Sequence, residues 1–101
     1  MAKKVIWSLR AQNDRKEILE YWIKRNKSKV YSRKLAKLFR QAEKLITNYP
    51  EIGKPTDSKN VRIKVVRDYL LIYEIKKNQI FILTIWDSRQ NPEKLEKQLE
   101  K

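Results

Sequence analysis

The chain has 101 residues, with 25 Lys and Arg against 12 Asp and Glu, and a formal net charge of +13. This length is typical of one domain, which we expect to span residues 1–101. Because the chain has no His, no Cys and only one Gly, it excludes zinc fingers, thiol nucleophiles, Ser-His-Asp triads and glycine-rich phosphate loops.

The composition also bears on location and partners. The apolar segments are too short to span a bilayer, and the basic start Met1–Trp7 lacks the apolar stretch of a signal peptide. Without cysteine, nothing indicates an oxidising compartment. We therefore expect a cytoplasmic protein whose positive charge favours an acidic partner: nucleic acid, anionic lipid or an acidic protein.

The first half of the chain predicts a short strand followed by two helices. The apolar run Lys4–Ser8 is typical of a strand, and Ser8 can cap a helix that continues to about Asn26. Apolar residues at steps of three or four predict a second helix over residues 28–48, which Tyr49-Pro50 ends. The link between the two helices is so short that we expect an antiparallel helical hairpin.

The second half predicts a loop and then three strands. Residues 51–60 contain the turn formers of a loop, and Val61–Val65 alternates apolar and basic residues as a strand does. Tyr69–Ile75 is almost continuously apolar, which predicts a central strand buried on both faces. Lys77-Asn78 predicts a tight turn, since Asn tolerates positive φ, and Gln79–Trp86 predicts the last buried strand.

The predicted order is therefore β-α-α-β-β-β, followed from Asn91 by a short charged C-terminal helix or tail. Pro92 suits the first position of a helix, but Leu95 and Leu99 are the only apolar residues of this segment. Three consecutive strands predict an antiparallel meander with the helical hairpin packed on one face. The expected class is an α+β fold with two layers.

The positive charge is concentrated in the helical half, because residues 1–50 carry 14 basic and 4 acidic residues. At roughly 100° per residue, five cations of the second helix form one stripe opposite its apolar residues. This basic stripe consists of Lys29, Arg33, Lys37, Arg40 and Lys44. One interpretation is a solvated helix face. We favour a partner-binding surface, because a stripe with almost no acidic neighbours repels itself.

A second group of cations lies on the predicted strands. Arg62 and Lys64 alternate with apolar residues, so we expect both to point to the same side, away from the core. Arg67 follows in the turn, and Arg89 ends the last strand. In an antiparallel meander these two residues lie at the same edge of the sheet. The alternative to a functional site is an edge strand protected by charge. The acidic residues have no spacing that indicates paired-carboxylate catalysis or a metal site.

In three segments, and in the order of its elements, the chain resembles toxins of the RelE/ParE superfamily, the toxic half of type II toxin–antitoxin systems. The segments are the loop Tyr49–Pro55, the central strand with its preceding turn, Val65–Ile75, and the ending Ile85–Pro92. The resemblance covers nearly the whole chain. It implies a cytoplasmic protein that arrests bacterial growth and is neutralised by a cognate antitoxin with an acidic segment. It further implies that operator DNA is bound only through the antitoxin, and that neither a membrane nor a cofactor or metal is involved.

Two mechanisms occur in this superfamily. RelE-like members cleave mRNA on the ribosome without a metal: the 2′-OH of the message attacks the adjacent phosphate, and basic residues stabilise the developing charge. On that template Arg62, Lys64 and Arg89 match basic residues of the site, with Arg67 a further candidate. The match is incomplete, because Leu70 stands where the family has Arg, and the C-terminal segment has no Tyr.

ParE-like members instead poison DNA gyrase and are not nucleases. The long helical hairpin and the loop residues 50–55 look more like that branch. The resemblance therefore favours a gyrase poison, with the ribosome-dependent mRNA endonuclease as the alternative. A third interpretation is a non-toxic basic domain that binds nucleic acid, with affinity that falls steeply as salt rises.

Overall fold

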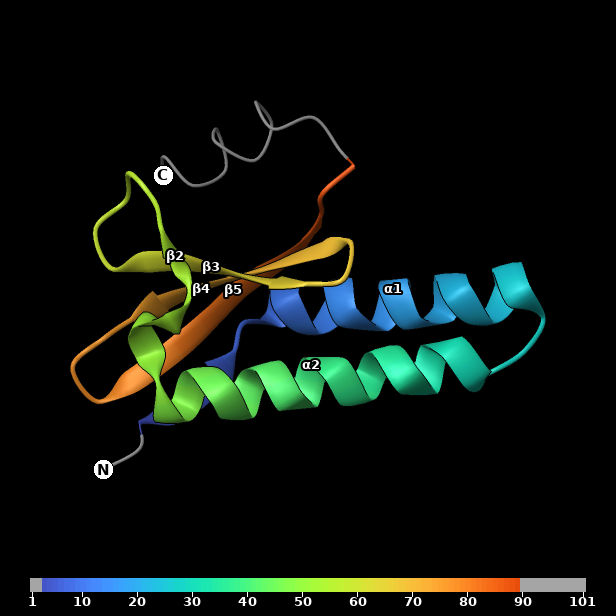
Figure 1. Cartoon of the computed structure of the whole chain (residues 1–101), viewed down its shortest axis with the longest axis horizontal. Helices are drawn as coiled ribbons and strands as arrows, with labels where there is room; N and C mark the ends of the chain where they lie inside the picture. The colour runs from blue at the N-terminus through green and yellow to red at the C-terminus, as the bar shows by residue number, and fades with distance from the viewer. Residues whose placement is uncertain (1–2, 90–101) are drawn as a thin grey trace.

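A helical hairpin packs on one face of a five-stranded sheet in the computed structural model, which describes residues 3–89 (Figure 1). The expected α+β class and the predicted order of strand, two helices and three strands are confirmed. The predicted segment from Asn91 lies outside the described residues. The elements are β1 (Lys4–Trp7), α1 (Leu9–Asn26), α2 (Val30–Asn48), the 3-10 turn η1 (Pro50–Ile52), β2 (Lys54–Pro55), β3 (Val61–Val66), β4 (Tyr69–Ile75) and β5 (Gln79–Asp87).

The sheet has the strand order β1-β5-β4-β3-β2. Strands β3, β4 and β5 form the predicted antiparallel meander. The sheet is mixed, because β1 pairs in parallel with β5, from Lys4 opposite Gln79 to Trp7 opposite Ile82. The segment expected to be a plain loop contributes η1 and the two-residue strand β2, which pairs with Ile63 and Arg62 of β3.

The predicted cap of α1 is confirmed, and it also fastens the helix to the sheet. The Ser8 hydroxyl accepts a hydrogen bond from the Ala11 amide at 3.0 Å and donates one to the Leu83 carbonyl at 2.8 Å. The Ser8 amide donates to the Ile82 carbonyl at 2.9 Å. One serine therefore fixes both the start of α1 and its position against β5.

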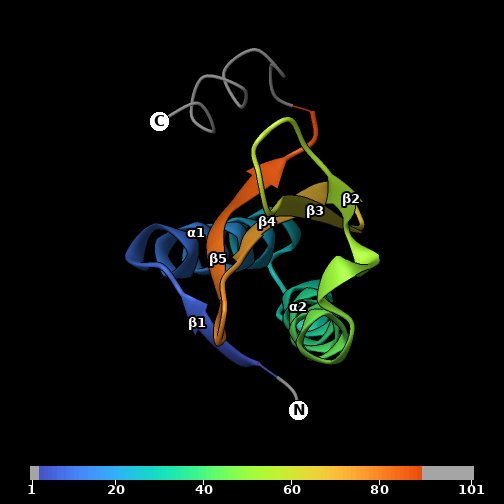
Figure 2. The ribbon, with the colours of Figure 1, turned by 90° about the vertical axis from the view of Figure 1, so that its left-hand side faces the viewer.

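The two helices form the expected hairpin and lie beside each other when viewed end-on (Figure 2). Lys27 closes α1 in the left-handed region, with φ 51°, and its amide donates to the Ile23 carbonyl. Helix α2 begins at Val30, two residues later than predicted. The turn at residues 77–78 forms, but the positive φ expected of Asn78 is wrong; among residues 3–89 only Lys27, Asn60 and Arg67 have φ above zero outside glycine.

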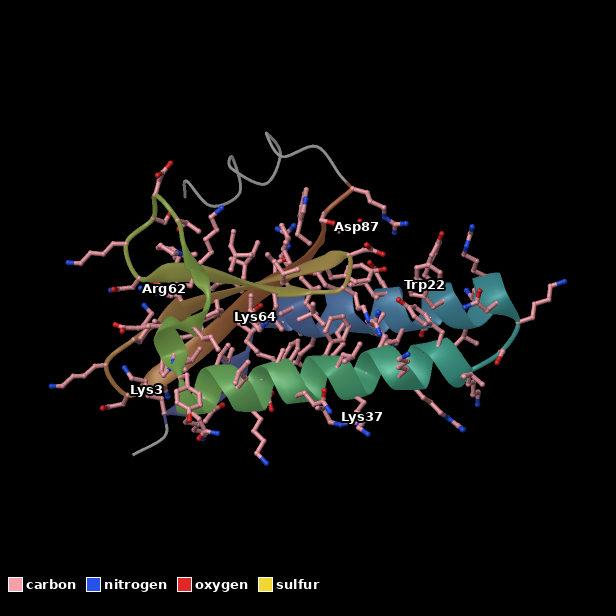
Figure 3. The ribbon with its side chains drawn as sticks, in the orientation of Figure 1. Lys3, Trp22, Lys37, Arg62, Lys64 and Asp87 are labelled. Carbon is pink, nitrogen blue, oxygen red and sulfur yellow. The ribbon has the colours of Figure 1, made fainter. Side chains whose placement is uncertain are left out.

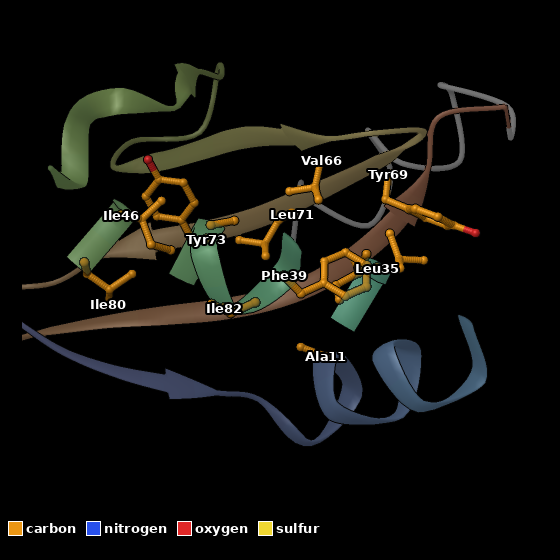
Figure 4. Packing of buried hydrophobic residues seen from close by; sticks show 12 residues of the cluster. Ala11, Leu35, Phe39, Ile46, Val66, Tyr69, Leu71, Tyr73, Ile80 and Ile82 are labelled. Carbon is orange, nitrogen blue, oxygen red and sulfur yellow. The ribbon is translucent and has the colours of Figure 1, made fainter. Parts of the chain in front are cut away.

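The main core lies between the helices and the sheet (Figure 4). Helix α2 contributes Leu35, Phe39 and Ile46, all fully buried, because they recur at helical spacing on one face. The expected burial of β4 on both faces is confirmed: Leu71 belongs to this core, whereas Ile72 packs with Val61 and Trp86 on the opposite face of the sheet. Neither α1 nor α2 is apolar enough over its length to cross a membrane.

Candidate functional site

Strand β3 carries two of the cations predicted for a catalytic site, and both point to the side of the sheet that bears the helices. Val61 and Ile63 belong to the apolar cluster on the opposite face, whereas Val66 belongs to the main core. Because side chains alternate along a strand, Arg62 and Lys64 share the face of Val66. The prediction that both lie on one side is confirmed, but the prediction that they point away from the core is wrong. The alternation predicts which residues share a face, but both faces of this sheet carry apolar side chains.

Arg62 is held by the loop that precedes it in the chain. Its Nη1 atom donates to the Glu51 carbonyl at 2.9 Å and to the Gly53 carbonyl at 2.7 Å. Both acceptors are main-chain oxygens, one within η1 and one directly after it. The guanidinium therefore fastens this loop to β3, which is a structural role.

Lys64 and Arg67 come together beside α2. They line a groove of about 260 Å³ with Leu38, Leu45 and Val65 as apolar neighbours, which we call the α2 groove. Strand β2 covers β3 only at Ile63 and Arg62, so residues 64–66 have no neighbouring strand on their outer side within the described range. Val65 is 58% exposed there. An open strand edge, an apolar wall and two cations together form a surface suited to an extended acidic segment.

Arg89 lies at the other end of the meander from Arg62 and is paired with Asp87. Its Nε donates to Asp87 Oδ1 at 2.9 Å and its Nη2 to Oδ2 at 2.7 Å. The hydrogen bonds from Arg89 hold the pKa of the Asp87 carboxyl below its usual range, and the same pairing raises the pKa of the guanidinium. Arg67 and Arg89 were predicted to lie at the same edge of the sheet. The main chains next to them do meet there, because the Ser88 amide donates to the Asp68 carbonyl at 2.8 Å.

A second groove, of about 350 Å³, lies between α1 and this end of the sheet. The Asp87–Arg89 pair lines it, together with Asp14, Glu17 and Tyr21 of α1. The Asp14 carboxylate is itself engaged, because it accepts from the Thr84 hydroxyl at 2.5 Å and from the Ile85 amide at 3.2 Å. No group of three or more carboxylates within residues 3–89 is arranged to hold a metal ion.

The five cations of the basic stripe are all exposed. Figure 3 shows Lys37 projecting from α2 on the side away from the sheet. In the part of the chain that the structure describes, the only ion pairs are Lys76–Glu74 and Arg89–Asp87. The single acidic residue of α2, Glu43, accepts a hydrogen bond from the Trp7 indole and does not neutralise the stripe.

The sequence did not reveal the anchor of the 50–55 loop. The Tyr73 hydroxyl donates to the Pro50 carbonyl at 2.6 Å and accepts from the Gly53 amide at 2.9 Å. Burial raises the pKa of this hydroxyl. The requirement for glycine follows, because a Cβ on Gly53 would lie 2.5 Å from the Tyr73 oxygen. A tyrosine in a buried strand is a weak signal of such a partner, since its hydroxyl usually finds one.

Comparison with known proteins agrees with this architecture. The sequence matches the model of the ParE toxin of the type II toxin–antitoxin system parDE over residues 5–92. A chain of the chromosomal ParDE toxin–antitoxin system from P. aeruginosa has a similar structure, with a TM-score of 0.73 and 17% identity over 85% of this chain and 96% of that one. A search by sequence among curated proteins gives no match.

The family match and the structural similarity together identify the fold as that of the RelE/ParE superfamily of toxins, with a helical hairpin on a mixed sheet. Since the family match covers most of its length, the chain belongs to the ParE toxin family of type II toxin–antitoxin systems.

Proposed function

We propose that this protein arrests bacterial growth by poisoning DNA gyrase and does not cleave RNA. The observation that carries this proposal is the separation of Arg62 from Arg89, two of the cations that an mRNA nuclease of this fold would use. Arg62 is bound to loop carbonyls, Arg89 is bound to Asp87, and Leu70 occupies the position where RelE-like enzymes have Arg.

Stabilising a pentavalent phosphate requires donors that converge on one point. The sheet register argues against such convergence here. Arg62 lies opposite Tyr73, whereas Asp87, two residues before Arg89, lies opposite Tyr69. Four residues of β4 separate the two positions, which is about 13 Å along a strand. The two arginines also flank β4 from different sides. This separation supports the proposal that the two arginines do not share one phosphate-binding site.

The proposal includes a cognate antitoxin whose acidic segment neutralises the toxin. The α2 groove is the surface that we assign to this segment. Lys64 and Arg67 supply charge complementarity, Leu38 and Leu45 supply apolar contact, and the open edge at residues 64–66 can pair with an extended chain. We further propose that the protein acts in the cytoplasm and that the antitoxin recognises the operator sequence.

Controlled expression in bacteria that lack the antitoxin, with pulse labelling of DNA and protein synthesis, tests the target. Gyrase poisoning predicts that DNA synthesis fails first, with filamentation. With purified gyrase the protein should cause cleaved DNA to accumulate. The Arg62→Ala, Lys64→Ala double variant, compared at equal abundance, should keep this activity.

A different outcome would favour the nuclease. If translation fails first, purified gyrase is unaffected, and the double variant is folded but harmless, the gyrase proposal is wrong. Lys64, Arg67, Arg62 and Arg89 would then be the residues to examine one by one. Normal growth at a confirmed level of folded protein would instead support a domain without toxicity.

A further inference from the structure

The outer face of α2 carries a row of cations that no other part of the described structure uses. All five members of the basic stripe are exposed, and none of their side chains makes a hydrogen bond or ion pair within residues 3–89. Helix α1 is different, because acidic residues such as Asp14, Glu17 and Glu20 alternate with its cations. Like charges at i,i+4 destabilise a helix, so the stripe weakens α2 unless a partner neutralises it.

The stripe is straight and regularly spaced. Its members advance by four, four, three and four residues, which corresponds to steps of about 4.5 to 6 Å at 1.5 Å per residue. From Lys29 to Lys44 the row spans about 22 Å. Duplex DNA presents one phosphate per about 1.7 Å of its axis, so a segment of that length offers more phosphates than the row has cations.

We infer that the basic stripe binds the phosphate backbone of double-stranded DNA directly and without regard to sequence. The chemistry of the face favours DNA over a protein. Protein interfaces have an apolar centre rich in aromatic residues, whereas protein–DNA interfaces are polar and positively charged. No apolar side chain lies within the stripe. The exposed Val30 and Tyr49 lie at the start of α2 and just beyond its end.

The same face is poorly suited to single strands. Proteins that bind single-stranded nucleic acid combine cations with several aromatic side chains on which bases stack. The stripe itself has no aromatic member, and a single exposed aromatic residue, Tyr49, follows its last cation. The helix that carries the cations is already folded, so only their side chains have to be ordered when they meet a duplex.

This DNA-binding face is separate from the surface assigned to the antitoxin. At roughly 100° per residue, Lys37 and Arg40 lie on the side of α2 opposite Leu35, whereas Leu38 and Leu45 lie on the flank that faces β3. The toxin can therefore hold an acidic segment in the α2 groove and DNA on the stripe at the same time. The antitoxin would choose the sequence, and the stripe would add backbone affinity, which replaces the expectation that operator DNA is bound only through the antitoxin. The inference holds whether or not gyrase is the target.

The test is binding of the purified full chain to a fluorescent 20-base-pair duplex of arbitrary sequence, followed by anisotropy as salt is raised. Five phosphate contacts predict a slope of log K against log salt of about −4.5, which is about a 500-fold loss between 50 and 200 mM salt. A second, unrelated duplex should bind equally well.

A matched pair of variants separates the stripe from the overall charge. One changes the five stripe residues to Gln. The other changes five exposed lysines elsewhere to Gln, namely Lys4, Lys16, Lys24, Lys59 and Lys77. Each removes five positive charges from the net charge of +13. We expect the stripe variant to lose most of the slope and at least about 100-fold in affinity at 50 mM salt, and the control to keep both. Circular dichroism confirms that each is folded.

Three results would overturn the inference. Equal losses in the two variants would show that binding follows net charge alone. If single-stranded DNA bound as tightly as the duplex, and the stripe variant kept that affinity, the binding site would lie elsewhere on the protein. Loss of binding to a poly-glutamate peptide in the stripe variant, with duplex binding intact, would identify the stripe as a protein-docking surface. Failure of gyrase poisoning would leave the duplex result unchanged, so the two proposals fail independently.

Discussion

The hydroxyl of Tyr73 lies 2.9 Å from the amide nitrogen of Gly53, and this contact fixes the loop that joins the helical layer to the sheet. Tyr73 is fully buried in β4, and Gly53 is buried between η1 and β2. The same hydroxyl donates to the Pro50 carbonyl at 2.6 Å, so one side chain satisfies a donor and an acceptor of a buried main chain. The loop is therefore anchored to the folded core through buried Gly53, although its other residues are exposed or only partly buried.

Removing this hydroxyl should destabilise the protein. Tyr73→Phe leaves the Gly53 amide and the Pro50 carbonyl without a partner, and we expect the free energy of unfolding to fall by about 1–3 kcal/mol. Urea denaturation measures the change. Tyr49→Phe is the matched control, because Tyr49 is 64% exposed and its hydroxyl has no partner in the described structure; it should change stability by less than about 0.5 kcal/mol. Equal effects of the two changes would contradict the anchoring role.

Gly53→Ala should be destabilising for a steric reason. A Cβ would lie 2.5 Å from the Tyr73 oxygen and 3.0 Å from the Ile63 carbonyl oxygen. The φ of Gly53 is −72°, so the backbone itself would accept alanine. We expect a loss of about 1–3 kcal/mol. The Gly53→Ala, Tyr73→Phe double variant lacks the hydroxyl that makes the closest clash. The stability lost in the double variant should therefore be smaller than the sum of the losses in the two single variants. Strict additivity in the urea experiment would rule out this contact as the cause.

Much of the fold could be predicted because its signals are local. Apolar spacing predicted α2, the serine before α1 predicted its cap, and the alternating and continuous apolar runs predicted the meander. The pairing of β1 with β5 could not be predicted, because its partners are 75 residues apart and a parallel pair has no turn to fix its register. Strand β2 was missed because Lys54-Pro55 has no apolar pattern of its own.

The candidate site was harder to predict than the fold. The sequence correctly predicted that Arg62 and Lys64 lie on the same face of the sheet. It did not predict which face, because apolar residues lie on both and only the structure shows which face the helices cover. It could not show that the Arg62 guanidinium is occupied by carbonyls 9 and 11 residues earlier in the chain. The exposure of the basic stripe could be predicted, since a helix with a strongly apolar face leaves the opposite face to solvent. The sequence alone did not identify which molecule binds the stripe.

The two cations of β3 should differ in what they contribute. Arg62→Gln removes two hydrogen bonds to the 50–55 loop, and we expect a loss of about 1 kcal/mol in the free energy of unfolding. Lys64→Gln should change stability by less than about 0.5 kcal/mol, because its only side-chain hydrogen bond within residues 3–89, to the Val65 carbonyl, is long at 3.4 Å. Both variants should still arrest growth at equal abundance. A fully stable but harmless Arg62→Gln variant would contradict the structural assignment.

The Asp87–Arg89 pair predicts a specific dependence of stability on pH. Hydrogen bonds from Arg89 lower the pKa of Asp87 in the folded protein below its value in the unfolded chain. A carboxyl with a lowered folded pKa stabilises the protein above its unfolded pKa of about 3.9, and this contribution is lost as pH falls through the folded value. Stability should therefore decline on acidification below about pH 4. An NMR titration of the Asp87 carboxyl carbon reports the folded pKa directly.

Arg89→Gln is the decisive variant for this pair. It removes both charged hydrogen bonds while leaving the Asp87 carboxylate and the groove beside α1 in place. The pKa of Asp87 should rise towards its ordinary value, and the acid-dependent part of the stability assigned to this carboxyl should shrink. Lys77→Gln, which changes an exposed cation in the turn at the opposite end of β5, should leave the titration unchanged. An Asp87 pKa that stays low in Arg89→Gln would show that other donors, such as the main-chain amide of residue 89 at 2.9 Å, hold the carboxylate without the guanidinium.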